Sequence, residues 1–470
     1  MSALIWFRQD LRIEDNPALT AAVRSGRPVY AAYILSSNER NGWSLGGASK
    51  VWLHLSLKAL TEELAKIGIQ LILRKGPVLK TLQHLIVEIK AEAVFWNRTY
   101  EPFTIARDTG IASKLREEGL QVASYNSALL FEPWEVANKQ GRPFQVFTPF
   151  WKKCLELDFK RECLPAPSKQ KPPNKIKSLS LEELQLLPAI PWDDGIKKAW
   201  QPGAKYALKR LHDFHSKALK EYAHNRDYPS LDGISRLSPY LHFGEISPGQ
   251  IVQELRGSHA EAYIRQLGWR EFAHHLLYHF PDTPENPLKA EFSHFPWQYN
   301  TERLRAWQKG ITGYPLIDAG MRQLWQTGWM HNRARMVAGS FLVKDLLLPW
   351  QQGAAWFWDT LVDADLANNT LGWQWVAGCG ADAAPYFRIF NPITQSETFD
   401  PDGDYIKQWV PELTKMPAKY IHAPWLAPPE IIRRAAVELG KNYPFPIVDH
   451  NEARKKALLA FETIKTHKKL

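Results

Sequence analysis

The stretches WMHNRARM (Trp329–Met336) and DADLANNTLGWQW (Asp363–Trp375) bring amides, arginines, acids and tryptophans together at short spacing. Asn332, Arg335 and Met336 stand at positions i, i+3 and i+4, so on a helix they share one face. The second stretch adds polar and aromatic groups at Asp363, Asp365, Asn369, Trp373 and Trp375. A buried packing segment does not need so many polar groups, and we interpret both stretches as a functional site on helical elements.

The chain around this site is long enough for two domains. It has 470 residues, of which 45% are hydrophobic, which is more than one ordinary core organises. Its net charge of +10 favours a polyanionic partner such as nucleic acid, although many soluble enzymes are equally basic.

The cysteines and the hydropathy pattern indicate the cellular compartment in which the protein is expected. Cys154, Cys163 and Cys379 include no Cys-x-x-Cys pair, so neither a disulfide framework nor a zinc site is expected. Arg8 and Asp10 come too early for a secretory leader, and no apolar run approaches about 18 residues. We therefore expect a cytoplasmic protein, a monomer, with no membrane contact.

Short apolar runs alternate with amphipathic stretches in the first third of the chain. They predict buried strands at Leu4–Phe7, Val29–Leu35, Leu71–Leu73, Ala93–Trp96 and Gln121–Ala123. Asn16-Pro17 predicts a helix start, and the spacing of Leu53, Leu57, Leu60 and Leu64 predicts a helical face. Such alternation indicates a doubly wound parallel sheet. No Gly-x-Gly-x-x-Gly follows the first run, so a conventional dinucleotide grip is not expected there.

Between Leu164 and Ile190 the composition turns to proline, lysine and serine, which cannot bury enough apolar surface for a core element. Beyond Trp192 helical patterns dominate, with helices expected at Tyr206–Ala223, Pro248–Leu255, Ala260–His279 and Met330–Leu347. We predict an α/β domain at residues 1–131, a connector at 132–195 and a larger all-α domain at 196–470.

Several familiar sites are excluded by spacing. Asp363-Ala364-Asp365 does not open an EF-hand, because Asn368 and Gln374 stand where that loop needs glycine and glutamate. No Gly-x-Ser-x-Gly nucleophile motif occurs. His274-His275 lacks a third ligand at metal spacing, so packing or surface is favoured and no metal is expected. The two acids have an ordinary alternative too, an ion pair with Arg333 or Arg335.

Trp269 and Trp375 are the aromatic residues with the most polar surroundings. Packing explains most of the 20 tryptophans individually. Trp269, however, is flanked by Gln266 and Arg270, and Trp375 stands in GWQWVAGCG, whose glycines indicate a loop. Two flat aromatic walls suit an extruded nucleobase, since stacking contributes about 1–3 kcal/mol per base. The turn GISRLSPYLHFG (Gly233–Gly244) offers hydroxyls that suit either a phosphate or an ordinary helix cap.

These segments resemble the DNA photolyase/cryptochrome family, closest to the class I cyclobutane pyrimidine dimer photolyases. Further motifs that carry the resemblance are WFRQDLR (Trp6–Arg12), GWREF (Gly268–Phe272), the run Trp307–Met336 and DAAPYFRIFNPITQ (residues 382–395). Together they follow the family's order over nearly the whole chain. The resemblance implies an N-terminal α/β domain, a helical C-terminal domain that binds U-shaped FAD, and the activity of a deoxyribodipyrimidine photolyase, a carbon-carbon lyase acting on UV-damaged DNA.

By this resemblance, two groups of residues hold FAD. The phosphates would be bound by Tyr222, Ile234, Ser235, Arg236, Leu237 and Ser238, and the ribose and flavin by Asp363, Ala364 and Asp365. Asn369 would face flavin N5, and Arg335 would pair with Asp363 beside the ring. Ile234 replaces a threonine common in this turn, which removes one hydroxyl contact.

The resemblance also implies the substrate and the mechanism. Excited reduced FAD would donate an electron to a cyclobutane pyrimidine dimer flipped out of DNA, the ring would split and the electron would return. The lesion and its flanking DNA would meet Arg226, Gln266, Trp269, Arg270, Asn332, Met336, Trp375 and Gln395. Trp307, Trp350 and Trp373 would form the family's tryptophan chain, which carries electrons from the surface to oxidised flavin.

Gln266 bears on the substrate, because glutamate is usual there in cyclobutane dimer photolyases and an amide supplies no acidic proton. Glutamine is typical of pyrimidine-pyrimidone photolyases and animal cryptochromes, yet those carry a histidine pair where this chain has Asn332 and Met336. Cyclobutane dimer repair is therefore favoured over the alternatives, a cryptochrome-type blue-light photoreceptor, pyrimidine-pyrimidone repair, or a non-enzymatic DNA-binding flavoprotein. An antenna chromophore is expected, with 5,10-methenyltetrahydrofolate as the default, although Glu101 or Trp43–Lys50 suit a pterin or deazaflavin.

Overall fold

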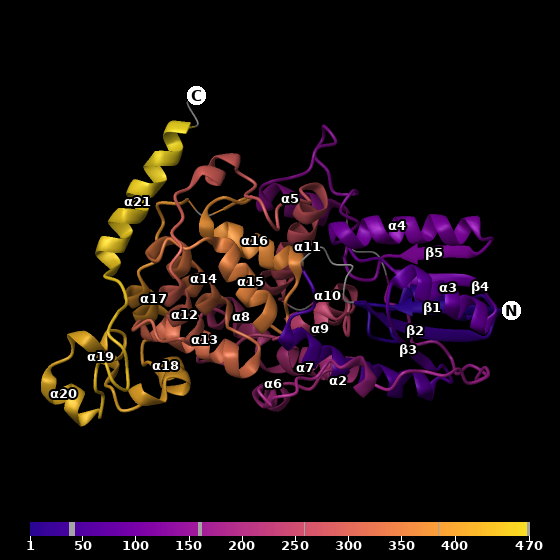
Figure 1. Cartoon of the computed structure of the whole chain (residues 1–470), viewed down its shortest axis with the longest axis horizontal. Coiled ribbons are helices and arrows are strands. Elements are labelled where there is room, and N and C mark those ends of the chain that lie inside the picture. The colour runs from indigo at the N-terminus through magenta and orange to yellow at the C-terminus, as the bar shows by residue number, and fades with distance from the viewer. Residues whose placement is uncertain (37–42, 158–161, 258, 384, 468–470) are drawn as a thin grey trace. The chain divides into compact units, whose positions relative to one another are not determined.

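The chain divides into two compact units in the computed structural model, which describes residues 1–36, 43–157, 162–257, 259–383 and 385–467 (Figure 1). Unit 1 comprises Met1–Lys220, Ser235–Pro281 and Val362–Asp365, and unit 2 comprises Glu221–Ile234, Asp282–Leu361 and Leu366–Leu470. The division groups residues that contact one another, so segments of the two units alternate along the sequence. The boundaries expected at residues 131 and 195 stay predictions.

Unit 1 contains the predicted parallel sheet. Its strands are β1 (Ser2–Phe7), β2 (Val29–Leu35), β3 (Leu71–Lys75), β4 (Ala91–Asn97) and β5 (Gln121–Tyr125), and every predicted strand is confirmed. All neighbouring strands pair in parallel in the order β3-β2-β1-β4-β5. The order reverses between β1 and β4. In open α/β sheets that switch point, at the carboxyl ends of the strands, is where ligands bind.

Both faces of the sheet are covered, which explains why the strands read as continuous apolar runs. Leu4, Trp6 and Val94 point to one face, where they form a core with residues of α3 (Val78–Ile89) and α4 (Pro102–Glu117). On the other side α1 (Pro17–Arg24) contacts β1, β4 and β5. Asn16 caps α1 as predicted, because its side chain accepts from the Leu19 amide at 3.0 Å.

The remaining elements of unit 1 are helical. They are α2 (Gly47–Lys66), α5 (Phe147–Leu157), η1 (Glu182–Leu184), α6 (Asp194–Ala199), α7 (Ala204–Lys217), η2 (Leu219–Glu221), α9 (Ser238–His242), α10 (Pro248–Glu254) and α11 (Glu261–His279). The four leucines predicted to share a face of α2 are all buried. The connector binds the sheet edge through its backbone, since the Leu179 amide donates to the Leu73 carbonyl at 3.2 Å.

Unit 2 contains no strand among its described residues. Its elements are α8 (Tyr222–Asn225), η3 (Ala290–His294), α12 (Thr301–Lys309), α13 (Pro315–Thr327), α14 (Asn332–Ser340), η4 (Phe341–Asp345), α15 (Trp350–Thr360), α16 (Leu366–Ala377), α17 (Pro392–Phe399), α18 (Asp404–Trp409), η5 (Pro411–Leu413), α19 (Ala418–Ile421), η6 (Pro424–Leu426), α20 (Pro429–Arg434) and α21 (His450–His467). In the described part of the chain, no helix has the length and apolar character needed to cross a membrane.

Two local predictions in unit 2 are corrected. The helix expected at Met330–Leu347 is two elements, because α14 passes into the π-helix η4 at Phe341. The sequence GWQWVAGCG is mostly helix rather than loop, since α16 runs to Ala377 and contains Gly372. Trp373 and Trp375 are therefore two positions apart on a helix and face different directions: Trp373 is 3% exposed and Trp375 is half-buried.

Candidate active site

The predicted phosphate turn begins α9 in unit 1. Arg236 adopts a left-handed backbone with φ of 52°, a conformation that costs free energy in a non-glycine residue and is common at binding sites. The Ser235 hydroxyl accepts from Tyr263 at 2.8 Å, and the Ser238 hydroxyl donates to an Asp363 carboxylate oxygen at 2.6 Å. Hydroxyls and a carboxylate thus meet at one turn, and this set of donors and acceptors fits the phosphates and ribose of a nucleotide cofactor.

Asp365, beside Asp363, lies between two imidazoles of the same unit. Its Oδ2 is 3.5 Å from His274 Nε2 and 3.7 Å from His242 Nδ1, and all three side chains are at most 15% exposed. Burial by itself raises the pKa of Asp365, but the two histidines outweigh burial and hold this pKa well below its usual range. His274 therefore contacts a carboxylate and is not the simple packing or surface residue that was expected.

Helix α11 carries the predicted lesion wall. The Trp269 ring stacks on Phe147 with ring centroids 3.8 Å apart and an interplanar angle of 7°, so one indole face is covered. Gly268 permits close packing nearby, because a Cβ there would lie 2.5 Å from the Trp151 ring. Trp269 and Gln266 are both half-buried. A rigid aromatic platform with an amide one turn away is therefore present before any substrate binds.

Arg270, predicted to contact DNA, also binds the protein's own backbone. Its side chain is 12% exposed, and Nη1 donates to the Ala128 carbonyl at 2.7 Å. The adjacent Glu271 is buried and accepts from the Leu130 amide at 2.9 Å. Burial raises the pKa of Glu271 to about 7, against the lowering effects of Arg270 and His274. These contacts join the segment after β5 to α11, and the DNA contact of Arg270 stays a prediction.

In unit 2, α14 confirms the predicted helical face. Asn332 Nδ2 donates to Met336 Sδ at 3.6 Å, and Arg335 Nε donates to the Met330 carbonyl at 2.8 Å. Arg333 forms an ion pair with Asp227 at 2.5 Å, so this arginine has an acidic partner other than the acids at 363 and 365. The predicted pairing of Arg335 with Asp363 stays a prediction.

The predicted tryptophan chain lies on α12, α15 and α16 of unit 2. Trp307 and Trp373 have ring centroids 6.1 Å apart, and Phe357 contacts both rings. Trp373 packs so closely on α15 that a Cβ at Gly353 would lie 2.1 Å from its ring. Trp307 is 0% exposed, so it does not itself reach the surface.

The remaining predicted residues of unit 2 each have separate surroundings. Asn369 Nδ2 donates to the Ala354 carbonyl at 3.1 Å, which fixes the amide orientation. The Arg226 guanidinium lies 5.7 Å from the buried Tyr222 ring. Ile234 and Gln395 are half-buried. Their roles in cofactor and DNA binding stay predictions.

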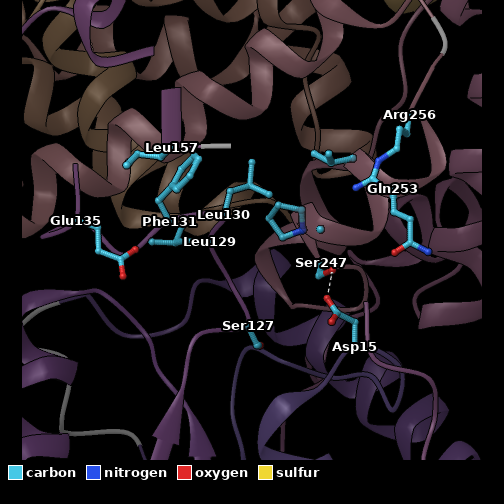
Figure 2. Close-up of a pocket in the computed structure, with 13 residues that line it drawn as sticks. Asp15, Ser127, Leu129, Leu130, Phe131, Glu135, Leu157, Ser247, Gln253 and Arg256 are labelled. Atoms are coloured by element: carbon cyan, nitrogen blue, oxygen red, sulfur yellow. Dashed lines mark hydrogen bonds between the residues drawn. The ribbon is translucent and has the colours of Figure 1, made fainter. Parts of the chain in front are cut away.

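A cavity of about 430 Å³ in unit 1 is lined by none of the predicted site residues (Figure 2). The Ser247 hydroxyl donates to Asp15 at 2.6 Å at one end, and Figure 2 shows Glu135 and Arg256 on opposite sides. Leu157, the last residue of α5, also lines the cavity. No pattern in the sequence predicted this cavity.

A smaller cavity, of about 40 Å³, lies at the carboxyl ends of β1, β2 and β4 in unit 1 and includes Glu101, one of the predicted antenna residues. Four buried polar atoms in its lining have no hydrogen-bond partner among the described residues: Trp6 Nε1, Arg8 Nε, Gln9 Nε2 and Thr99 Oγ1. Unpaired buried donors and acceptors are costly, so a water molecule or another polar group is expected to satisfy them.

The fold and these residues define a two-part nucleotide-binding protein, and comparisons with known proteins identify its family. Residues 263–463 match the FAD binding domain of DNA photolyase, and residues 3–173 match the DNA photolyase family. The chain belongs to the DNA photolyase/cryptochrome family and carries that family's FAD-binding domain. The described residues contain no group of three or more side chains suited to a metal.

Similar proteins include both photo-lyases and cryptochromes. A deoxyribodipyrimidine photo-lyase from Agrobacterium fabrum is 47% identical over 98% of each chain. Cryptochrome-2 from Arabidopsis thaliana is 41% identical over 96% of this chain and 77% of its own length. A solved bacterial class III photolyase from Agrobacterium tumefaciens has a TM-score of 0.96, 46% identity and coverage of 99% of this chain and 98% of its own. The expected likeness to class I in particular is not confirmed.

Proposed function

We propose that this protein repairs cyclobutane pyrimidine dimers in DNA, using blue light and bound reduced FAD. Trp269 carries the proposal: its indole is backed by Phe147 at 3.8 Å and is therefore a preformed platform on which a flipped-out base can stack. The net charge of +10 favours binding to the phosphate backbone. A monomer acting on DNA in the cytoplasm is part of this proposal.

The residues of the chain have distinct tasks in the proposed reaction. Reduced FAD supplies the electron when light excites it. The Ser235–Ser238 turn and Asp363 would hold the nucleotide part of the cofactor, while Asn369, fixed by Ala354, would present its amide to the flavin. Trp269, Trp375, Asn332 and Met336 would enclose the lesion, with Arg226, Arg270 and Gln395 on its backbone or flanking DNA. Gln266 would donate from its amide to a lesion carbonyl.

The tryptophans would deliver the electron that keeps the cofactor reduced. Trp373 and Trp307 contact each other and share Phe357, so electron transfer between them needs only a short step. Trp350 is 2% exposed and begins α15. Because Trp307 is buried, a more exposed residue has to form the outer end of the chain.

We also propose that the smaller cavity at the β1, β2 and β4 ends receives the antenna chromophore. Its four unsatisfied polar atoms and Glu101 favour a polar ring system that both donates and accepts hydrogen bonds. The present volume of about 40 Å³ suffices for one or two water molecules, so a ring enters only after side chains move. Methenyltetrahydrofolate, another pterin and a deazaflavin all fit this chemistry.

A cryptochrome-type photoreceptor is the second candidate, favoured by the 41% identity with Cryptochrome-2. Pyrimidine-pyrimidone repair is the third, favoured by Gln266. One experiment separates them: the reduced, FAD-loaded protein is illuminated with oligonucleotides that carry one lesion of either kind, with dark controls. Light-dependent recovery of the dimer alone supports the proposal. Recovery of the pyrimidine-pyrimidone lesion alone, or of neither lesion despite bound FAD, overturns it in favour of the corresponding alternative.

A further inference from the structure

Arg265 lies one turn before Trp269 on α11 and shares a face of the helix with it. The two residues are four positions apart, a spacing at which helical side chains are neighbours. The guanidinium carbon of Arg265 lies 4.7 Å from the centroid of the Phe147 ring, and the same ring stacks on Trp269 at 3.8 Å. Phe147, which α5 contributes, therefore joins the aromatic platform to a cation within unit 1.

The charge of Arg265 is not neutralised by a neighbouring acid. Its side chain is exposed, whereas that of Arg270 is 12% exposed and donates to the Ala128 carbonyl. Glu261 stands four residues earlier, a spacing that suits a helical ion pair. In the described part of the chain, however, Arg265 has the Phe147 ring as its partner and no carboxylate. A fixed positive charge thus faces solvent beside the platform.

The arrangement of this charge suits a phosphate group. A guanidinium that packs on an aromatic ring keeps its planar set of N–H donors available at its edge, and two such donors match two phosphate oxygens. A nucleotide whose base stacks on Trp269 carries its phosphates on the adjoining sugar. A long side chain one helical turn away is able to reach them.

We propose that Arg265 binds a phosphate of the damaged DNA strand and so positions the backbone beside the flipped base. This inference rests on the proposed function, in which Trp269 is a wall of the lesion pocket. A phosphate contact contributes affinity and register but reads no base, so Arg265 serves undamaged DNA as well as damaged DNA. Phe147 positions both groups, the indole for the base and the guanidinium for the backbone.

The test is the salt dependence of DNA binding by the FAD-loaded protein in the dark. Fluorescence anisotropy gives the Kd of wild type, Arg265→Gln and Arg265→Lys for an undamaged and a dimer-containing duplex oligonucleotide between 50 and 200 mM salt. Loss of one phosphate contact lowers the slope of log Kd against log salt by about 0.9, so the weakening in Arg265→Gln should be roughly 3.5-fold larger at 50 mM than at 200 mM. The weakening should be equal for both oligonucleotides. Arg265→Lys keeps the charge and should keep the wild-type slope.

Arg116→Gln is the matched control, because it removes the same charge from a different part of unit 1. Arg116 is an exposed arginine near the end of α4, where it donates to the Val122 carbonyl at 3.3 Å. Its slope should equal that of the wild type. A wild-type slope in Arg265→Gln, or equal changes in Arg265→Gln and Arg116→Gln, would overturn the proposal.

A purely structural role gives a different result. If Arg265 only supported Phe147 and Trp269, Arg265→Gln would weaken binding of the damaged oligonucleotide alone and leave the salt slope unchanged. That result overturns the proposal, as does a slope in Arg265→Lys as low as that in Arg265→Gln.

Failure of this inference and failure of the proposed function are distinguishable. A protein that repairs dimers but keeps the wild-type salt slope in Arg265→Gln refutes the inference alone. A protein in which Arg265→Gln changes the slope as predicted, but which repairs no lesion, refutes the proposed function alone.

Discussion

Replacing Trp269 by alanine tests the lesion wall most sharply. The substitution removes the platform on which a base would stack, a contact of about 1–3 kcal/mol, so the Kd for dimer-containing DNA should rise roughly 5- to 150-fold. It also removes the 3.8 Å stack on Phe147, which contributes about 0.5–1.5 kcal/mol beyond area burial, so the variant should melt at a lower temperature. The site residues Ser238 and Asp363 are bonded to each other independently of Trp269, and FAD content should be unchanged.

The assay is fluorescence anisotropy in the dark, with labelled oligonucleotides that either contain one dimer or are undamaged. The loss of affinity should be confined to the damaged oligonucleotide, because undamaged DNA is held by its phosphates. Trp192→Ala is the matched control, since Trp192 is 39% exposed in the connector and should affect neither Kd. An unchanged Kd for damaged DNA in Trp269→Ala, with FAD still bound, would remove this residue from the lesion pocket and with it the observation that carries the proposed function.

Three further predictions concern electron delivery, stability and substrate contact. Trp373→Phe should slow light-driven reduction of oxidised FAD at least tenfold while leaving repair by chemically reduced protein intact; a normal rate of photoreduction in absorbance measurements would exclude Trp373 from the chain. Burial raises the pKa of Glu245 from 4.5 to about 8, so its stabilising contribution is complete below pH 4.5 and is lost as pH rises toward 8. Glu245→Gln keeps an acceptor for the Trp52 ring NH, which lies 3.1 Å from the Glu245 carboxylate. Relative to the wild type, its free energy of unfolding should therefore increase by up to about 1.4 kcal/mol per pH unit between pH 5 and 8. Denaturation experiments at pH 5 and pH 8 that give the same difference between variant and wild type would contradict this. Gln266→Glu should raise the repair yield about two- to tenfold by adding an acidic hydrogen-bond donor, and an equal or lower yield would show that the site is adapted to the amide.

The strands and helix starts of unit 1 were predictable because their signals are local. Apolar runs identified all five strands, and Asn16-Pro17 identified the start of α1, since capping depends on residues within one turn. The prediction of a loop at Trp373–Trp375 was wrong because it relied on the local glycines alone. Glycine weakens a helix by only about 1 kcal/mol, and the packing of Trp373 on Gly353 of α15 outweighs that cost.

The site itself was predictable in its residue types and less so in its contacts. The face shared by Asn332 and Met336 follows from helical spacing and is confirmed. The His274–Asp365 contact joins residues far apart in the sequence, and no local pattern reveals such a pairing. The bond from Arg270 to Ala128 is equally distant in sequence, so this internal contact was not predicted either. The support of Trp269 by Phe147 went unpredicted for the same reason.

The action spectrum of repair shows directly whether excited reduced FAD drives the reaction. Loss of cyclobutane dimers from a defined oligonucleotide is measured at a series of wavelengths, together with the oxidation state of the bound FAD, in anaerobic protein without added reductant. We predict that repair follows the absorption of reduced FAD, with many dimers repaired per FAD because the electron returns. Absence of repair, or oxidation of one FAD for each dimer lost, would contradict it.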